Sequence, residues 1–156
     1  MDETLAAVRA FLESQSTMAL ATVSEEGLPG VAPVYYVSEG LALYWLSSPA
    51  SRHSAALRAR GRAAAAVYPA VWQWSAIRGV QVEGDTAPVR GAERRRILRL
   101  YRSRFQLPAE LEAAVAAGTL YVLRPRRVRW LDNRVGFGYR AEVRLDAAGA
   151  PEEEAT

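Results

Sequence analysis

Two spacings of hydrophobic residues divide the chain into helical and extended segments. Residues 2–14 and 91–105 carry apolar side chains three or four positions apart, which places them on one face of a helix. A shorter helix is predicted around residues 107–117. Elsewhere, apolar residues alternate with polar ones or form short runs bounded by turn residues, which is typical of strands. The predicted strands cover residues 17–24, 30–37, 41–47, 62–71, 75–89, 119–131 and 139–145.

The first three strands follow one another through short turns, which predicts an antiparallel meander. Six or seven such strands in one open sheet would leave a hydrophobic face bare. We therefore predict a mainly β fold, a small closed or split β-barrel with peripheral helices, over residues 1–145. Residues 146–156 lack apolar periodicity and are acidic, so they predict a disordered tail.

Composition excludes several kinds of chemistry. The 156 residues include no cysteine and one histidine, and all 20 basic residues are arginine. Disulfides, thiolate sites and lysine Schiff bases are therefore impossible, and we predict no metal site and no hydrolase site. The apolar runs are too short to span a membrane, and the start "MDETLAAVRAF" is acidic where a signal peptide is basic. We expect a cytoplasmic protein without a membrane partner.

The segment "SSPASRHSAALRARG", residues 47–61, interrupts the strands with a helix. Ser48 is a favourable N-cap, Pro49 suits the first helical position and Gly61 suits the position after the helix end. Leu57 is expected to face the core. The two glycines of the strand 75–89, Gly79 and Gly84, predict a bulge or a close approach of another backbone.

The start of that helix has two interpretations. A helix N-terminus presents unpaired amides and partial positive charge, so with Arg52 and the hydroxyls of Ser47 and Ser51 it can hold a phosphate. In the simpler interpretation, Ser48 only caps the helix while Arg52 and His53 are solvated. The residues alone favour the simpler interpretation.

Two other segments are candidates for a ligand site. In "WQWSAIRGVQVEG", Trp72 and Trp74 are expected to share one strand face, as an aromatic wall for a flat ligand or as barrel core or dimer interface. In "VRWLDNRVGFGYR", Trp130 and Arg140 flank a glycine-rich bend, where they could meet a ligand. The alternative there is a plain hairpin in which Asp132 pairs with an arginine.

The arginine run "ERRRILRLYRSR" raises the question of nucleic-acid binding. Its arginines fall on the outer side of an amphipathic helix, which is typical of a solvated face. The net charge of +3 is modest. Nucleic acid is therefore a disfavoured partner.

The segments taken in order resemble the pyridoxamine 5′-phosphate oxidase-like family of flavin-binding split barrels. The resemblance is carried by "ATVSEEGLPGVAPVYYV", "LYWLSSPASRHSAALRARGRAAAAV", "IRGVQVEG" and, less strongly, "WLDNRVGFGYR", which span most of residues 17–140. It implies a homodimer of split barrels with FMN in two clefts at the interface. It also implies an oxidoreductase in which the flavin performs the redox chemistry, so no side chain is identified as catalytic.

The resemblance assigns cofactor contacts by position. The strand 31–36 would lie along the isoalloxazine and ribityl chain, largely through backbone groups, and the residues around Ser47 would surround the phosphate. Trp130 and Arg140 would approach from the second subunit. The complete set is Val31, Ala32, Pro33, Val34, Tyr35, Tyr36, Leu46, Ser47, Ser51, Arg52, His53, Arg78, Gly79, Trp130 and Arg140.

The chain departs from the family pattern at three places. His53 stands where a lysine is usual, so FMN retention is expected to depend on pH. Gly79 stands where the oxidase carries a flavin-contacting glutamine, for which Arg78 is a candidate substitute. The substrate-binding Arg-Leu-His segment is absent from residues 131–139, so pyridoxamine phosphate is not the expected substrate.

Other functions of the same fold remain open. The electron donor and the small-molecule substrate are not identified by the residues, NAD(P)H being one candidate donor. The deazaflavin F420 could replace FMN in the same phosphate pocket, and a flavin-binding stress or storage protein would need no turnover. A nucleic-acid-binding barrel without a cofactor is the least favoured alternative.

Overall fold

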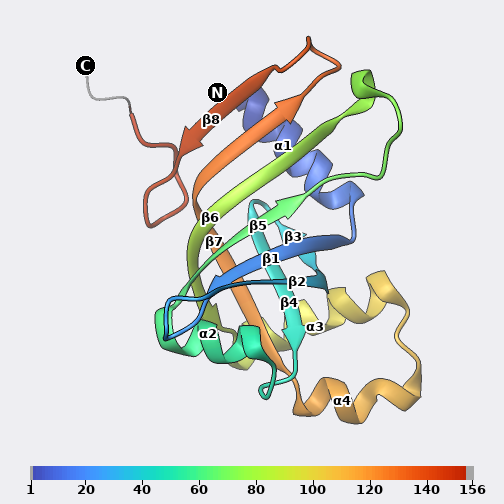
Figure 1. Cartoon of the computed structure of the whole chain (residues 1–156). Coiled ribbons are helices and arrows are strands. Elements are labelled where there is room, and N and C mark those ends of the chain that lie inside the picture. Colours follow the sequence, from blue (N-terminus) through green and yellow to red (C-terminus); the bar gives the residue numbers. More distant parts are fainter. Residues whose placement is uncertain (1, 154–156) are drawn as a thin grey trace.

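The structure, a computed structural model, describes residues 2–153 and consists mainly of one curled antiparallel sheet (Figure 1). The strands are β1 (Thr17–Val23), β2 (Pro29–Tyr35), β3 (Val37–Glu39), β4 (Ala42–Ser47), β5 (Arg62–Val67), β6 (Arg78–Pro88), β7 (Thr119–Asp132) and β8 (Arg140–Arg144). The helices are α1 (Asp2–Ser14), α2 (Arg52–Arg60), α3 (Gly91–Phe105) and α4 (Glu112–Ala117), with short 3₁₀ turns η1 (Trp74–Ala76) and η2 (Ala109–Leu111).

The two ends of the sheet are joined by a single residue, Tyr36. The strand order is β2-β1-β5-β6-β7-β4-β3, with β8 added beside β7. The end strands β2 and β3 are consecutive in the chain, so the sheet curls until they meet at Tyr36. The ring of Tyr36 is buried and its hydroxyl donates to the carbonyl of Leu12 at 2.7 Å. These features confirm the predicted split barrel with peripheral helices.

Two details of the strand prediction were wrong. Tyr36 divides the predicted strand 30–37 into β2 and β3, so the described residues form eight strands. The predicted meander of three neighbouring strands does not form either, because β4 pairs with β3 and β7 and not with β2. The local turn pattern was correct, but the long-range pairing of β7 between β6 and β4 could not be derived from it.

Two hydrophobic cores hold the helices against the barrel. The first fills the barrel and includes Leu5, Val8, Phe11 and Leu12, the predicted inner face of α1. The second lies under α3 and α4 and includes the predicted inner residues of α3, Ile97, Leu98 and Tyr101. Figure 1 shows α1 across one side of the barrel, α3 and α4 at another, and α2 beside the ends of β1 and β2.

Gly84 permits the closest backbone contact in β6. The β6–β7 register shifts between Glu83 and Gly84, and a Cβ at position 84 would lie 2.1 Å from the carbonyl oxygen of Arg124. Gly79 is also closely packed, because a Cβ there would lie 3.0 Å from the carbonyl oxygen of Val67. Both predicted close approaches are confirmed.

The arginines of α3 mostly bind the protein itself. Arg94 donates to the carbonyls of Val115 and Gly118, and Arg104 donates to the carbonyls of Glu13 and Gln15. Arg96 and Arg102 pair with Glu39 and Glu112. Because these guanidinium groups fasten α3 to neighbouring segments, the helix offers few free cations to a polyanion.

The chain folds back after β8. The Leu145 and Pro151 positions form an isolated antiparallel bridge, and the amide of Glu152 donates to the carbonyl of Arg144 at 2.9 Å. The sequence predicts no order for residues 146–156, of which 154–156 lie outside the described residues. Within residues 2–153, no helix is long and apolar enough to cross a membrane.

Candidate functional site

The predicted phosphate-binding residues meet at the junction of β4 and α2. Ser47, the last residue of β4, is buried, and its Oγ lies 2.7 Å from Nε2 of His53. The Oγ of Ser51 lies 3.3 Å from the same nitrogen. The turn at residues 48–51 therefore brings two hydroxyls and the chain's single imidazole into one cluster, which we call the Ser47–His53 cluster.

The cap of α2 differs from the prediction. Ser51, and not Ser48, is the N-cap, and its Oγ accepts from the amide of Ser54 at 3.2 Å. The carbonyl of Ser48 instead accepts from the amide of Ser51 at 3.1 Å and from the hydroxyl of Ser54 at 2.8 Å. The helix therefore begins at Arg52, which places Arg52 and His53 in its first turn. The predicted end at Gly61, with φ of 63°, is confirmed.

The first turn of α2 offers donors to an anion. The amides of Arg52 and His53 come before the first intrahelical donor, which is the amide of Ala55 bonded to the carbonyl of Ser51, and neither has a backbone partner of its own among residues 2–153. The guanidinium of Arg52 is exposed beside them, without an ion pair to any described residue. Unpaired amides, helix dipole, hydroxyls and a guanidinium together form the donor set that suits a phosphate.

His53 is half-buried, and burial lowers its pKa below the usual value for histidine. The imidazole is therefore neutral at pH 7 and shares a hydrogen bond with Ser47. An incoming phosphate dianion would favour the protonated ring, because an adjacent opposite charge stabilises the charged form. This is the only group of the cluster that titrates near neutral pH.

The strand predicted to contact the flavin is an exposed edge. Among the described strands, β2 pairs only with β1, and Pro29 and Pro33 lie within it, as is typical of edge strands. Val31 and Tyr35 are 73% and 57% exposed, and the ring of Tyr35 lies 4.9 Å from that of Phe105. The free edge leaves backbone groups available to a ligand.

The other predicted site residues of β2 and β4 and the intervening Tyr36 lie partly at the surface and partly in the core. Ala32 and Val34 are half-buried along β2, and Leu46 packs on the core under α3. The side chain of Tyr36 is fully buried, so only its backbone is near the edge. None of these residues adds a charged group to the site.

Arg78, Gly79, Trp130 and Arg140 lie at the opposite end of the barrel. Ser47 pairs with Thr119 at the start of β7, whereas Arg140 pairs with Leu131, twelve residues further along that strand. This corresponds to roughly 40 Å of extended strand. One chain therefore does not bring Arg140 to its own Ser47–His53 cluster.

Trp130 and Arg78 have structural contacts of their own. Trp130 is buried, and its ring lies 5.3 Å from that of Phe11. The guanidinium of Arg78 lies over the ring of the same Phe11, with its Cζ 5.0 Å from the ring centroid. Trp130 thus belongs to the barrel core, whereas Arg140 is exposed at the start of β8.

The tryptophan pair is not on a strand. Trp72 lies in a loop and is fully exposed, and Trp74 lies in η1 and is 61% exposed. The predicted common strand face was therefore wrong, and neither ring belongs to the core. The structure instead pairs Trp74 with Phe137, which the sequence analysis did not identify, at 5.7 Å between ring centroids. The signal for Phe137 was its place between two glycines in a bend.

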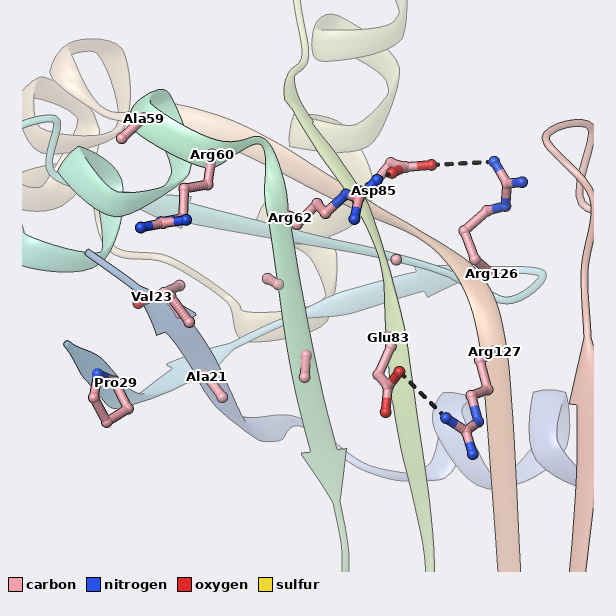
Figure 2. A pocket seen from close by; sticks show the side chains of 15 residues that line it. Ala21, Val23, Pro29, Ala59, Arg60, Arg62, Glu83, Asp85, Arg126 and Arg127 are labelled. Atoms are coloured by element: carbon pink, nitrogen blue, oxygen red, sulfur yellow. Dashed lines mark hydrogen bonds and ion pairs between the residues drawn. The ribbon is translucent and has the colours of Figure 1, made fainter. Parts of the chain in front are cut away.

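An open cavity of about 1090 Å³ lies along β1, β5 and β6 and extends to Pro29 and Gly30 of β2 and to the end of α2, and none of the predicted site residues lines it. Figure 2 shows its floor of small side chains, such as Ala21, between charged rims. Its acidic groups are already paired: Asp85 with Arg126 at 3.3 Å and Glu83 with Arg127 at 3.8 Å. No cluster of three potential metal ligands occurs in the part of the chain that the structure describes.

Comparisons with known proteins identify the family of the chain. The family model described as pyridoxamine 5′-phosphate oxidase matches residues 4–132. A UPF0306 protein of Klebsiella pneumoniae (strain 342) is 31% identical over 147 residues, covering 93% of this chain and 96% of that protein.

Solved structures share the fold at lower identity. A heme-binding protein from Mycobacterium smegmatis has a TM-score of 0.70 at 22% identity, covering 89% of this chain and 57% of that one. A Clostridium acetobutylicum protein related to general stress protein 26 has a TM-score of 0.70 at 13% identity, covering 94% and 97%. At these identities the structures support the split-barrel fold alone.

Proposed function

The chain belongs to the pyridoxamine 5′-phosphate oxidase-like family, without being the oxidase itself, and from this premise we propose that it binds FMN as a homodimer and uses it as an oxidoreductase. The observation that carries the proposal is the Ser47–His53 cluster. Its donors match the phosphate of FMN, and the two elements that form it, β4 and α2, both contact β2, along which the flavin ring would lie.

The separation along β7 supports the homodimer. Arg140 lies at the far end of that strand from Ser47, farther than one FMN molecule reaches. Arg140 can approach a flavin held by Ser47 only if a second copy supplies it. In a two-fold symmetric dimer, each copy would bring its Arg140 to the flavin held by Ser47 of the other copy, so both sites would be complete.

When bound, the flavin supplies the electron transfer. The residues of this chain would hold and orient it: the amides of Arg52 and His53 and the hydroxyl of Ser47 would bind the phosphate, and the edge of β2 would fix the ring. Arg140 of the second copy would place positive charge near the ring, which favours the anionic reduced form.

Two other functions make different demands on the same site. F420 would occupy the same phosphate donors but would need further basic groups for its longer tail. Non-catalytic flavin binding is favoured by one observation: the Ser47–His53 cluster itself contains no acid or base except His53, whose imidazole is hydrogen-bonded to Ser47. The heme-binding relative adds heme as a further outcome of the test.

The absorption spectrum of the purified protein, before and after incubation with each cofactor, tests the proposal. The two-band spectrum of oxidised flavin is expected. A single deazaflavin band would point to F420, a Soret band would point to heme, and no bound chromophore after adding FMN would overturn the proposal. Flavin-dependent oxidation of NADH or NADPH by the loaded protein would then separate an oxidoreductase from a carrier.

A further inference from the structure

An exposed group of aromatic and apolar side chains lies at the end of the barrel opposite the Ser47–His53 cluster. Trp74 and Phe137 are 61% and 84% exposed, and their rings meet edge to face at 79°. Exposed Ile77, Val135 and Tyr139 lie on the same two segments. We call these five residues the aromatic platform. Exposure of so many large apolar groups together is typical of a surface that binds something.

The platform is held in place by Asn133. Its side-chain amide donates to the carbonyl of Trp74 at 2.8 Å, its backbone amide donates to the carbonyl of Ile77 at 2.9 Å, and its Oδ1 accepts from the amide of Gly138 at 3.0 Å. These bonds tie the segment containing η1 to the β7–β8 turn. The platform is therefore formed by the folded chain before any ligand arrives.

The same turn is fixed by an ion pair. The buried carboxylate of Asp132 accepts from two guanidinium nitrogens of Arg134, at 2.9 and 2.8 Å, and from its amide at 3.0 Å. Arg140 follows the turn and is exposed, without an ion pair among residues 2–153. The platform thus has an unpaired cation at its margin.

A second apolar surface lies at the β1–β2 end, and its margin carries two carboxylates against one guanidinium, that of Arg60, which donates to the carbonyls of Ser24 and Glu25. Val23, Leu28 and Val31 are 42%, 65% and 73% exposed, and we call them the β2 strip. The turn between the two strands carries exposed Glu25 and Glu26, which have no ion pair among the described residues. An apolar strip with an acidic margin complements an apolar platform with a basic one.

Complementary surfaces at the two ends of one chain are what a two-fold dimer requires, since each platform would then meet the strip of the other copy. On the basis of the proposed FMN site, we infer that the Trp74–Phe137 pair of each protomer covers the flavin ring bound along β2 of its partner. The two rings are positioning residues that orient the flavin and keep water from one side of it. Phe137 is 84% exposed, so beyond its contact with Trp74 most of the side chain remains accessible.

Flavin fluorescence tests this inference, because an indole in contact with the isoalloxazine quenches its emission. The FMN-loaded wild-type dimer should be strongly quenched, and Trp74→Phe should raise the emission severalfold at unchanged FMN occupancy. Phe137→Ala should make the bound flavin more accessible to iodide. Trp72→Phe is the matched control, since Trp72 is fully exposed and outside the platform, and it should change neither readout.

The outcomes separate the two claims. If the wild-type protein loads FMN but Trp74→Phe and Phe137→Ala leave emission and iodide access unchanged, the covering role is overturned and the FMN site stands. If the wild-type protein loads no FMN, the proposed function fails and the inference fails with it. Both changes are at exposed side chains, and circular dichroism of each variant confirms that it folds.

Discussion

The hydroxyl of Ser47 and Nε2 of His53 are 2.7 Å apart, across the turn that joins β4 to α2. His53 lies in the first turn of α2, where its amide and that of Arg52 have no backbone partner among the described residues. The contact with Ser47 makes the imidazole both a part of the fold and a candidate ligand of phosphate. Variants at Arg52 and His53 separate the structural role of the imidazole from its role in phosphate binding.

Arg52→Ala should weaken FMN binding by about 1.5–3 kcal/mol, roughly 10- to 150-fold, because it removes a charged hydrogen bond to phosphate. Isothermal titration with FMN measures the change. Arg99→Ala is the matched control, since Arg99 is exposed on α3 and removes the same charge without a described partner. Equal affinities of the two variants would show that Arg52 does not contact the phosphate.

FMN affinity should fall as pH rises, because the imidazolium form of His53 pairs with phosphate and the neutral form does not. Burial lowers the pKa of His53 in the free protein, so the fall should begin below pH 6.5. Each pH unit between the free and bound pKa costs up to tenfold in affinity.

The His53→Gln variant supplies the reference for this pH dependence. The phosphate itself titrates near pH 6, and that contribution is common to both proteins. Subtracting the variant's profile isolates the imidazole. Parallel profiles from pH 5 to 8 would remove the role of His53 in phosphate binding.

The cofactor-free protein should lose stability in acid through the same residue. Since the folded-state pKa of His53 is lowered, the unfolded chain binds the proton more readily below pH 6.5. The contribution is complete above pH 6.5 and is lost as pH falls through the folded-state pKa. Urea unfolding at pH 7 and 5 should therefore show a smaller decrease for His53→Gln than for the wild type.

Gly84→Ala should destabilise the protein by about 3 kcal/mol or more, because the new Cβ would lie 2.1 Å from the carbonyl oxygen of Arg124. Gly136→Ala is the matched control, since a Cβ there meets nothing within 4 Å and the residue has no positive φ. Thermal unfolding should separate the two variants clearly. A Gly84→Ala protein as stable as the control would mean that β6 and β7 can separate at the bulge.

The helices and most strands could be predicted because their signals are local, whereas the pairing of β7 between β6 and β4 could not. The 3.6-residue spacing of Leu5, Val8 and Leu12 leaves little choice but α1, and the inner residues of α3 were found in the same way. The break at Tyr36 could not be found locally. The residues on either side of Tyr36 alternate between apolar and polar as one strand would. Their division into β2 and β3 coincides with the burial of the Tyr36 ring against α1, which no local pattern indicates.

The candidate site was predictable in its residues and not in its geometry. Ser48 and Ser51 are equally good caps by residue type, and the choice of Ser51 depends on how the turn after β4 packs. The spacing of Trp72 and Trp74 fits a strand face, but both rings are exposed outside the sheet. Asn133, which holds η1, acts across 59 residues of sequence and left no local pattern.

In the proposed function, the Ser47–His53 cluster holds the phosphate of FMN at a dimer interface. An FMN titration of the wild-type protein and of a Ser47→Ala, Arg52→Ala, His53→Gln triple variant, with the dimer mass followed by sedimentation, tests both parts at once. We expect one FMN per protomer in a wild-type dimer and binding lowered by at least two orders of magnitude in a triple variant that still folds. Equal FMN affinity of the two proteins, or a monomer that binds FMN as tightly as the dimer, would contradict the proposed function.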